Sequence, residues 1–148
     1  MNKINIKVIA EVGAVIPEYK TAGAAGADIY SHLSEPITIQ AGKSAMIPTG
    51  LFFEIPEGYE VQVRPRSGLA AKNGVTVLNS PGTIDSDYRG EIKVILVNLG
   101  DADFIVNDKE RIAQIVIAPI TQGSFTIAES LSKTERGTGG FGSTGVKA

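Results

Sequence analysis

The chain has 148 residues, of which 43% are hydrophobic and 20% are charged, so we expect one globular domain rather than a disordered polymer. The formal net charge of −2 argues against a nucleic-acid-binding protein, and the absence of cysteine excludes disulfides, zinc–thiolate sites and cysteine nucleophiles. No apolar run reaches the length of a membrane span, and Lys7 and Glu11 interrupt the N-terminal residues where a signal peptide would need an apolar stretch. We therefore expect a cytoplasmic protein without membrane or nucleic-acid partners.

Short strands are predicted one after another along most of the chain. Apolar and polar residues alternate in residues 4–8 and 59–64, which is the period of a half-buried strand. Further strands, separated by turn residues, are predicted at 37–39, 44–55, 75–79, 91–98, 103–106, 111–117 and 125–128. One short helix is expected at 69–73, with Ser67 as its cap and Gly74 as its end. This pattern predicts an all-β sandwich or barrel.

The last twenty residues differ from the rest. Five of the nine residues from 137 to 145 are glycine, a composition typical of a flexible terminus. Arg136 and Phe141 nevertheless add a cation and an aromatic ring, which suit a segment that folds over a ligand. We therefore divide the chain into a β domain over residues 1–128 and a flexible glycine-rich C-terminal arm over residues 129–148.

Two polar segments are candidates for chemistry. Residues 81–91 join two apolar runs and carry Asp85, Asp87, Tyr88 and Arg89, which suit either a polar hairpin loop or a site with a general base. The two aspartates also have the spacing of a D-x-D metal site, but turn residues surround them and the pattern alone is weak. Residues 66–68 offer a guanidinium, a hydroxyl and open backbone N–H groups, as a phosphate site or an ordinary turn would.

Taken together, five segments resemble the five ordered motifs of the homotrimeric dUTPases. They are AGADIY (25–30), PRSGLA (65–70), GTIDSDYRG (82–90), ERIAQ (110–114) and RGTGGFGSTG (136–145). Five motifs in the right order over nearly the whole chain are far more specific than any one of them. Members of this family hydrolyse dUTP to dUMP and pyrophosphate, which keeps uracil out of DNA and supplies dUMP for thymidylate synthesis.

The resemblance implies a distorted β jelly roll that assembles as a homotrimer. Three chains would form three active sites, each shared among all three subunits. The C-terminal arm would reach a site made mainly by the other two chains and close it as a lid.

The same resemblance implies a role for each candidate residue. Asp85 is the general base that orients and deprotonates the water attacking the α-phosphorus. Tyr88 lies under the deoxyribose and leaves no space for a ribose hydroxyl, and Phe141 stacks on uracil. The other implied substrate ligands are Asn79, Thr83, Ile84 and Lys93 for base and sugar, Arg66, Ser67, Gly68, Gln114 and Arg136 for the phosphates, and Gly142 and Ser143 in the lid.

Mg²⁺ is implied on the triphosphate itself, with Asp28 reaching the ion indirectly, through water. The remaining charged residues of the motifs are expected to form structural ion pairs; they are Asp87, Arg89, Glu91, Glu110 and Arg111.

Three alternatives accompany this interpretation. A dCTP deaminase of the same superfamily would need an acid that activates water at the cytosine ring. A non-catalytic nucleotide-sensing module would share the fold but needs no general base. A structural jelly roll, such as a coat protein, explains the strands but not the motifs.

Overall fold

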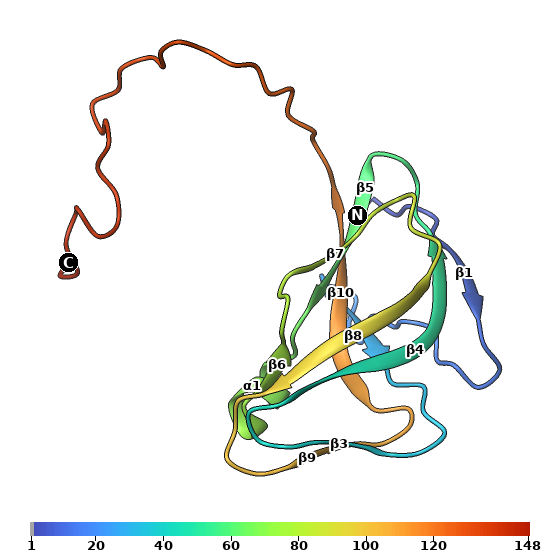
Figure 1. The fold of residues 1–148 in the computed structure, drawn as a ribbon. Helices are drawn as coiled ribbons and strands as arrows, with labels where there is room; N and C mark the ends of the chain where they lie inside the picture. The colour runs from blue at the N-terminus through green and yellow to red at the C-terminus, as the bar shows by residue number, and fades with distance from the viewer. Residues whose placement is uncertain (1) are drawn as a thin grey trace.

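The computed structural model describes residues 2–148 and confirms the predicted all-β fold (Figure 1). Within these residues ten strands and one helix follow in the order β1 (Lys7–Ala10), β2 (Ala27–Tyr30), β3 (Ile37–Ile39), β4 (Ser44–Glu54), β5 (Tyr59–Arg64), α1 (Ser67–Asn73), β6 (Val75–Val77), β7 (Gly82–Ile84), β8 (Glu91–Asn98), β9 (Phe104–Val106) and β10 (Arg111–Pro119). No helix of the described residues is long and apolar enough to cross a membrane.

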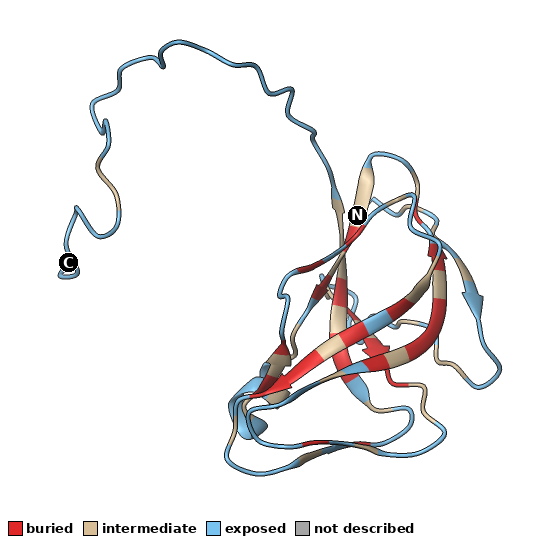
Figure 2. Cartoon of the chain, viewed as in Figure 1, coloured by how far each residue is buried: buried red, intermediate tan, exposed pale blue. Residues whose placement is uncertain are grey.

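The strands form two four-stranded antiparallel sheets and one two-stranded ribbon. The first sheet has the order β1-β4-β8-β6, the second has the order β2-β10-β5-β7, and β3 pairs with β9. Side chains from all three sheets join in one hydrophobic core, which Figure 2 shows as the buried interior of the body. Ile29, Leu51, Val61 and Leu96 lie at its centre, each at most 1% exposed.

Strand β8 is central in the first sheet, as its apolar sequence predicts. It pairs with β4 on one side and with β6 on the other. Ile92, Val94 and Leu96 face the core, whereas Lys93 is exposed and Ile95 is half-buried on the opposite face. The opposite face of β8 is therefore open enough to line a site.

Strand β4 has an irregular segment in the middle, where its register against β8 shifts between Pro48 and Phe52. Gly50 lies in this segment with a φ of 67°, a left-handed conformation that favours glycine. The Thr49 hydroxyl is fully buried and donates a hydrogen bond to the carbonyl oxygen of Ile92, 2.6 Å away. This bond fixes the start of β8, directly after the loop that carries Asp85.

Several sequence-based predictions of secondary structure were wrong in detail. The first strand begins at Lys7 rather than residue 4, and β2 and β7 form where loops were expected. The helix begins at Ser67 itself and Arg66 is its N-cap without a side-chain cap bond, whereas Gly74 ends it in the left-handed conformation as predicted.

The strand predicted at residues 125–128 is absent, since no residue from 120 to 148 belongs to a strand. In Figure 1 the chain leaves the body after β10 and extends away from it. Phe125 is 98% exposed and the Ile127 side chain is also fully exposed. A β-strand needs a hydrogen-bonded neighbour, and this segment has none within the single chain.

The side chain of Asn98 joins two pieces of backbone, strand β3 and the turn after β8. Its Nδ2 donates to the carbonyl oxygens of Ile39 and Ala102, at 2.9 and 2.8 Å, and its Oδ1 accepts from the Gly100 N–H at 3.0 Å. Asn98→Ala would leave these groups unpaired in a buried environment. We expect it to lower the free energy of unfolding by about 3 kcal/mol, measured by urea denaturation at fixed protein concentration.

The matched control is Asn5→Ala, because Asn5 is exposed and a surface substitution changes stability by at most about 0.5 kcal/mol. Equal stability of the two variants would contradict the structural role of Asn98.

Candidate active site

The loop that carries Asp85 is held at both ends by strands. Before it, β7 pairs with β5, with Ile84 opposite Val61 and Thr83 opposite Gln62. After it, the chain enters β8 at Glu91. Within the loop, the Tyr88 N–H donates to the Asp85 carbonyl at 3.2 Å, which closes a tight turn. The Asp85 side chain is exposed. Its backbone is held by the pairing of β7 and by the hydrogen bond from Tyr88.

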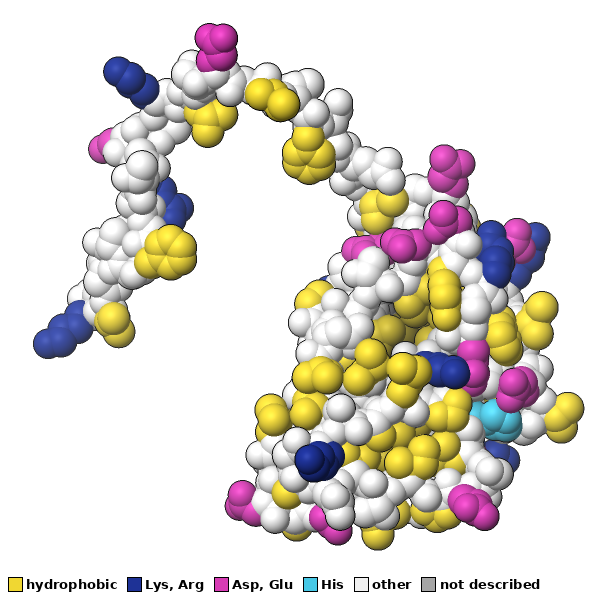
Figure 3. All heavy atoms as spheres, viewed as in Figure 1, with side chains coloured by type: hydrophobic (Ala, Val, Ile, Leu, Met, Phe, Trp, Pro, Cys, Tyr) yellow, Lys and Arg dark blue, Asp and Glu magenta, His cyan; other side chains and the backbone are white. Residues whose placement is uncertain are grey.

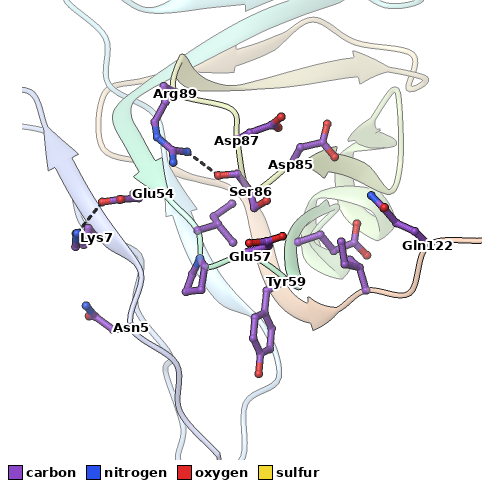
Figure 4. Close-up of a pocket in the computed structure, with 14 residues that line it drawn as sticks. Asn5, Lys7, Glu54, Glu57, Tyr59, Asp85, Ser86, Asp87, Arg89 and Gln122 are labelled. Atoms are coloured by element: carbon purple, nitrogen blue, oxygen red, sulfur yellow. Dashed lines mark hydrogen bonds and ion pairs between the residues drawn. The ribbon is translucent and has the colours of Figure 1, made fainter.

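Arg89 stabilises the same turn from its other side. Its guanidinium donates to the carbonyl oxygens of Ser86 and Tyr88, at 2.6 and 3.1 Å. The first of these bonds is drawn in Figure 4, where the side chains of Asp85 and Asp87 both project from the turn away from Ser86. The expectation that Arg89 has a structural role agrees with these contacts, although its partners are carbonyls rather than carboxylates.

A cavity of about 270 Å³ opens beside this loop and brings five of the predicted site residues together. Its walls come from β4, β7, β8 and the turn between β7 and β8. The predicted residues among them are Thr83, Ile84, Asp85, Tyr88 and Lys93, and the others are Met46, Glu91, Ile92 and Ile95. The cavity thus combines two carboxylates, an aromatic ring, a cation and apolar walls, which suits a small polar ligand with a flat ring.

The ring of Tyr88 is held against the backbone of Gly90. Its hydroxyl donates to the carbonyl oxygen of Glu91 at 2.9 Å. A Cβ atom on residue 90 would lie less than 3.0 Å from the ring atoms Oη, Cζ and Cε2 of Tyr88. Only glycine leaves room for this ring position, a constraint that the sequence alone does not reveal.

Glu91 links the cavity to the irregular segment of β4. Its Oε1 accepts a hydrogen bond from the Gly50 N–H at 3.1 Å, and its Oε2 lies 3.6 Å from Lys93 Nζ. Glu91 therefore forms the structural ion pair expected from the sequence. Through these contacts Glu91 connects Lys93 in the small cavity to the backbone of strand β4.

Asn79 lies beside the start of β7, since a Cβ on Gly82 would be 3.3 Å from its Nδ2. It is exposed and does not line the small cavity. The structure thus places Asn79 next to the strand that carries Thr83 and Ile84.

A second group of predicted residues gathers at the start of α1. Arg66, Ser67 and Gly68, which the sequence predicts as phosphate ligands and which are called the phosphate clamp on that basis, lie where β5 passes into the helix. Arg66 Nε is 3.1 Å from Asp28 Oδ1, and Gln114 Nε2 donates to the Pro65 carbonyl at 3.0 Å. Strands β2 and β10 bring these residues together, because Asp28 and Gln114 are directly opposite in their register.

Two members of this second group were not predicted as site residues. Arg111 Nη1 is 3.3 Å from Asp28 Oδ2, so its expected ion pair is with Asp28. Gly26 has no room for a side chain, because a Cβ there would overlap the Gln114 amide. Both relations join residues far apart in the sequence.

The lid residues of the prediction lie apart from both groups. Arg136, Phe141, Gly142 and Ser143 are on the extended arm, and Phe141 is fully exposed. Figure 3 shows the arm extending away from the body. The Arg136 guanidinium bonds only locally, with Nε donating to the Gly139 carbonyl at 2.8 Å. A single chain in this conformation does not bring the arm to the small cavity.

The larger of the two cavities that Asp85 lines, about 850 Å³, lies on the other side of Asp85 (Figure 4). Its lining includes five carboxylates, from Glu54, Glu57, Glu60, Asp85 and Asp87, but only two cations, from Lys7 and Arg89. The hydrogen bond from Lys7 lowers the pKa of Glu54 below its ordinary value. Despite its size, this acidic cavity is unsuited to a polyphosphate, so we place the candidate ligand site in the smaller cavity.

Comparison with known proteins identifies the family. The dUTPase family model matches residues 13–145. The deoxyuridine 5'-triphosphate nucleotidohydrolase of Chlamydia pneumoniae is 63% identical over 135 residues, which cover 90% of this chain and 93% of that protein. The chain belongs to the dUTPase family. The expectation of an enzyme of this family is thereby confirmed.

Solved structures of dUTPases share the fold. A glycine-to-serine mutant of the Staphylococcus bacteriophage 80alpha dUTPase with dUpNHpp has a TM-score of 0.88 and 27% identity, covering 97% of this chain and 100% of that one. An aspartate-to-asparagine mutant of the dUTPase from phage phi11 of S. aureus, studied for its coordination of a structural Mg(II) ion, has a TM-score of 0.77 and 23% identity, covering 86% and 98%. The predicted dUTPase jelly roll is confirmed.

Gly90→Ala is expected to displace the Tyr88 ring and break its hydrogen bond to Glu91, because the added Cβ overlaps three ring atoms. The φ of Gly90 lies outside the left-handed region, so the backbone itself accepts alanine. A crystal structure of the variant measures the ring position. Gly23→Ala is the control, since its Cβ would meet no atom within 4 Å; an unmoved ring in both variants would disprove the constraint.

Proposed function

We propose that this protein hydrolyses dUTP to dUMP and pyrophosphate, with Asp85 as the general base. One observation carries the proposal: Thr83, Ile84, Asp85, Tyr88 and Lys93 line a single small cavity. The relative from Chlamydia pneumoniae bears the name of this activity, and the 80alpha phage enzyme was solved with dUpNHpp, which supports the same substrate.

In the proposed reaction, the Asp85 carboxylate orients a water molecule and accepts its proton as the water oxygen attacks the α-phosphorus. The bond between the α-phosphorus and the bridging oxygen breaks, and pyrophosphate leaves with the electron pair. The turn around Asp85 is fixed by hydrogen bonds from Tyr88 and Arg89, so the base needs no large movement to reach its working position.

Selection of deoxyuridine is proposed to lie in the same cavity. The Tyr88 ring, fixed by Gly90, would occupy the space that a ribose 2′-hydroxyl needs. Thr83, Ile84 and Lys93 would contact base and sugar, Asn79 would bind the uracil edge, and Phe141 of the arm would stack on the ring. A base with a 5-methyl group would be excluded by shape.

The triphosphate is proposed to bind the phosphate clamp together with Gln114 and Arg136. Neither cavity that Asp85 lines includes a residue of the clamp, and the arm extends away from the body. These facts favour the homotrimer, in which the cavity, the clamp and the lid at one site come from different chains. In this proposal residues 1–128 are the jelly-roll domain and residues 129–148 are the lid.

Mg²⁺ fits this proposal as an ion carried by the triphosphate. Residues 2–148 contain no group of three or more His, Cys, Asp or Glu side chains able to hold a metal ion directly. Asp28 holds Arg66 and Arg111, but carboxylate oxygens have further lone pairs that can accept a hydrogen bond from a metal-bound water. When bound, the ion would neutralise charge on the leaving pyrophosphate.

The alternative from the same superfamily is dCTP deamination. A pyrophosphate and ammonia assay across dUTP, dTTP, UTP and dCTP separates the two activities. We expect pyrophosphate from dUTP alone, with the other nucleotides at least about a hundredfold slower, since a missing or clashing polar contact costs several kcal/mol. Ammonia from dCTP would refute the proposal, and no product from any nucleotide would favour a non-catalytic sensing module.

Asp85→Asn is expected to retain dUTP binding and to lower kcat by at least about a hundredfold, because the amide cannot accept the proton from water. Single-turnover rates and the affinity for dUpNHpp measure the two effects separately. The control is Asp87→Asn on the same loop, which we expect to keep near-normal kcat. If Asp85→Asn turns over at the wild-type rate, the base is another residue.

Truncation after Glu135 removes the lid motif and is expected to abolish most activity while preserving the oligomer. Light scattering and pyrophosphate release measure the two properties. Truncation after Gly145, which removes only three residues beyond the last motif, is the matched control. Full activity in the shorter variant would exclude a lid function for the arm.

A further inference from the structure

One largely buried carboxylate holds two arginines beside the phosphate clamp. Asp28 lies on β2 and its side chain is only 13% exposed. Its Oδ1 is 3.1 Å from Arg66 Nε and its Oδ2 is 3.3 Å from Arg111 Nη1. Arg66 precedes α1 and Arg111 begins β10, so Asp28 joins three elements of the fold.

The contacts leave part of the Arg66 guanidinium open. Its Nε is committed to Asp28, and its Nη1 makes one long contact of 3.5 Å to the carbonyl of Arg111. Within residues 2–148, Nη2 has no hydrogen-bond partner in the structure. A guanidinium held along one edge presents its other donors in a fixed direction, which is how arginine binds phosphate oxygens with good geometry.

The charges explain why two arginines are present. One carboxylate beside Arg66 alone would cancel its positive charge and leave nothing to attract a phosphate. Arg111 restores a net single positive charge to the group of three. Gln114, opposite Asp28 in the register, is neutral and adds no charge.

We infer that Asp28 is a positioning residue that fixes the Arg66 guanidinium for the substrate phosphates, and that Arg111 supplies the positive charge that Asp28 would otherwise cancel. The inference rests on the proposed function, in which Arg66 binds the triphosphate. It assigns Asp28 a role that needs no metal ion and gives Arg111 a role in substrate binding rather than in fold stability alone.

Asp28→Asn distinguishes three roles of Asp28: positioning Arg66, contributing only its negative charge, or acting only through the metal ion. The roles differ in the sign of the change in dUpNHpp affinity and in whether that change needs Mg²⁺. The affinity of the assembled protein is measured calorimetrically for dUpNHpp and for dUMP, each with Mg²⁺ and with EDTA. If Asp28 positions Arg66, the variant binds dUpNHpp about tenfold more weakly in both conditions, the effect of one lost charge-assisted hydrogen bond. Affinity for dUMP, which lacks the outer phosphates, changes less than about threefold.

Other results overturn the inference. Tighter dUpNHpp binding would mean that only the negative charge of Asp28 matters, and a loss seen only with Mg²⁺ would mean that Asp28 acts only through the metal. Asp101→Asn, an exposed aspartate in the turn after β8, is the matched control and should bind both ligands normally.

Arg111 is tested by a pair of variants. Arg111→Gln is expected to weaken dUpNHpp binding about tenfold and to reduce its salt dependence, whereas Arg111→Lys, which keeps the charge, recovers most of the affinity. Lys43→Gln is the control for loss of an exposed cation. Wild-type affinity for dUpNHpp in Arg111→Gln overturns the inference. If Asp28→Asn fails to assemble or to bind dUMP, the Arg111 variants alone test the inference.

Arg66→Gln distinguishes failure of the inference from failure of the proposed function. If Arg66→Gln binds dUpNHpp as tightly as the wild type, the proposed clamp is wrong, and Asp28 has no phosphate ligand to position. If Arg66→Gln loses affinity but Asp28→Asn does not, the clamp stands and only the positioning role is refuted.

Discussion

The antiparallel pair β4–β8 is the constraint on which the candidate site depends. It is the longest pairing in the first sheet, and its buried residues fill the centre of the core. Where β4 becomes irregular at Gly50, two side chains of β8 and β4 take over the missing ladder contacts: Glu91 accepts from the Gly50 N–H and Thr49 donates to the Ile92 carbonyl. The start of β8 is thereby fixed, and with it the position of the turn that carries Asp85 and Tyr88.

A second constraint is the exposed arm, which pairs with no strand of the single chain. The alternation of apolar Phe125 and Ile127 with polar residues predicts a strand, yet both side chains are fully exposed in the single chain. Strand β1 lies at the edge of its sheet, with β4 on one side only. Exposed apolar strand-like segments and open sheet edges are costly in water, so both features favour the assembled form that the proposed function requires.

The sequence predicted the all-β fold, and five of the predicted site residues line one small cavity, because motifs and alternation are local signals. It missed β2 and β7, since each has only three or four residues and depends on pairing with distant strands. It also misjudged residues 125–128, where the local pattern was right but the partner strand is absent from the chain. Whether a pattern becomes a strand is decided by tertiary contacts.

Contacts between distant residues could not be predicted from spacing. Arg111 and Asp28 are 83 positions apart, and Arg66 and Asp28 are 38 apart, so only the register of β2 with β10 reveals that one carboxylate serves both arginines. The tight approach of Tyr88 to Gly90 is local in sequence, but it depends on the ring rotamer, which no residue pattern specifies.

The charges around Asp85 also define a direction for the proposed substrate. On one side lies the large cavity, where Glu54, Glu57 and Glu60 would repel a polyphosphate. On the other lies the small cavity, which is less acidic because its lining has two carboxylates, Asp85 and Glu91, and one cation, Lys93. Two unit charges 4 Å apart interact by about 1 kcal/mol in water and by about 4 kcal/mol near a protein surface, so several like charges outweigh most single contacts. A nucleotide whose ring enters the small cavity must therefore direct its phosphates away from the large one. Because no clamp residue lines either cavity, the proposed homotrimer would supply the positive charge for those phosphates from another chain. In that proposal the acidic cavity would favour one orientation of the α-phosphorus before Asp85.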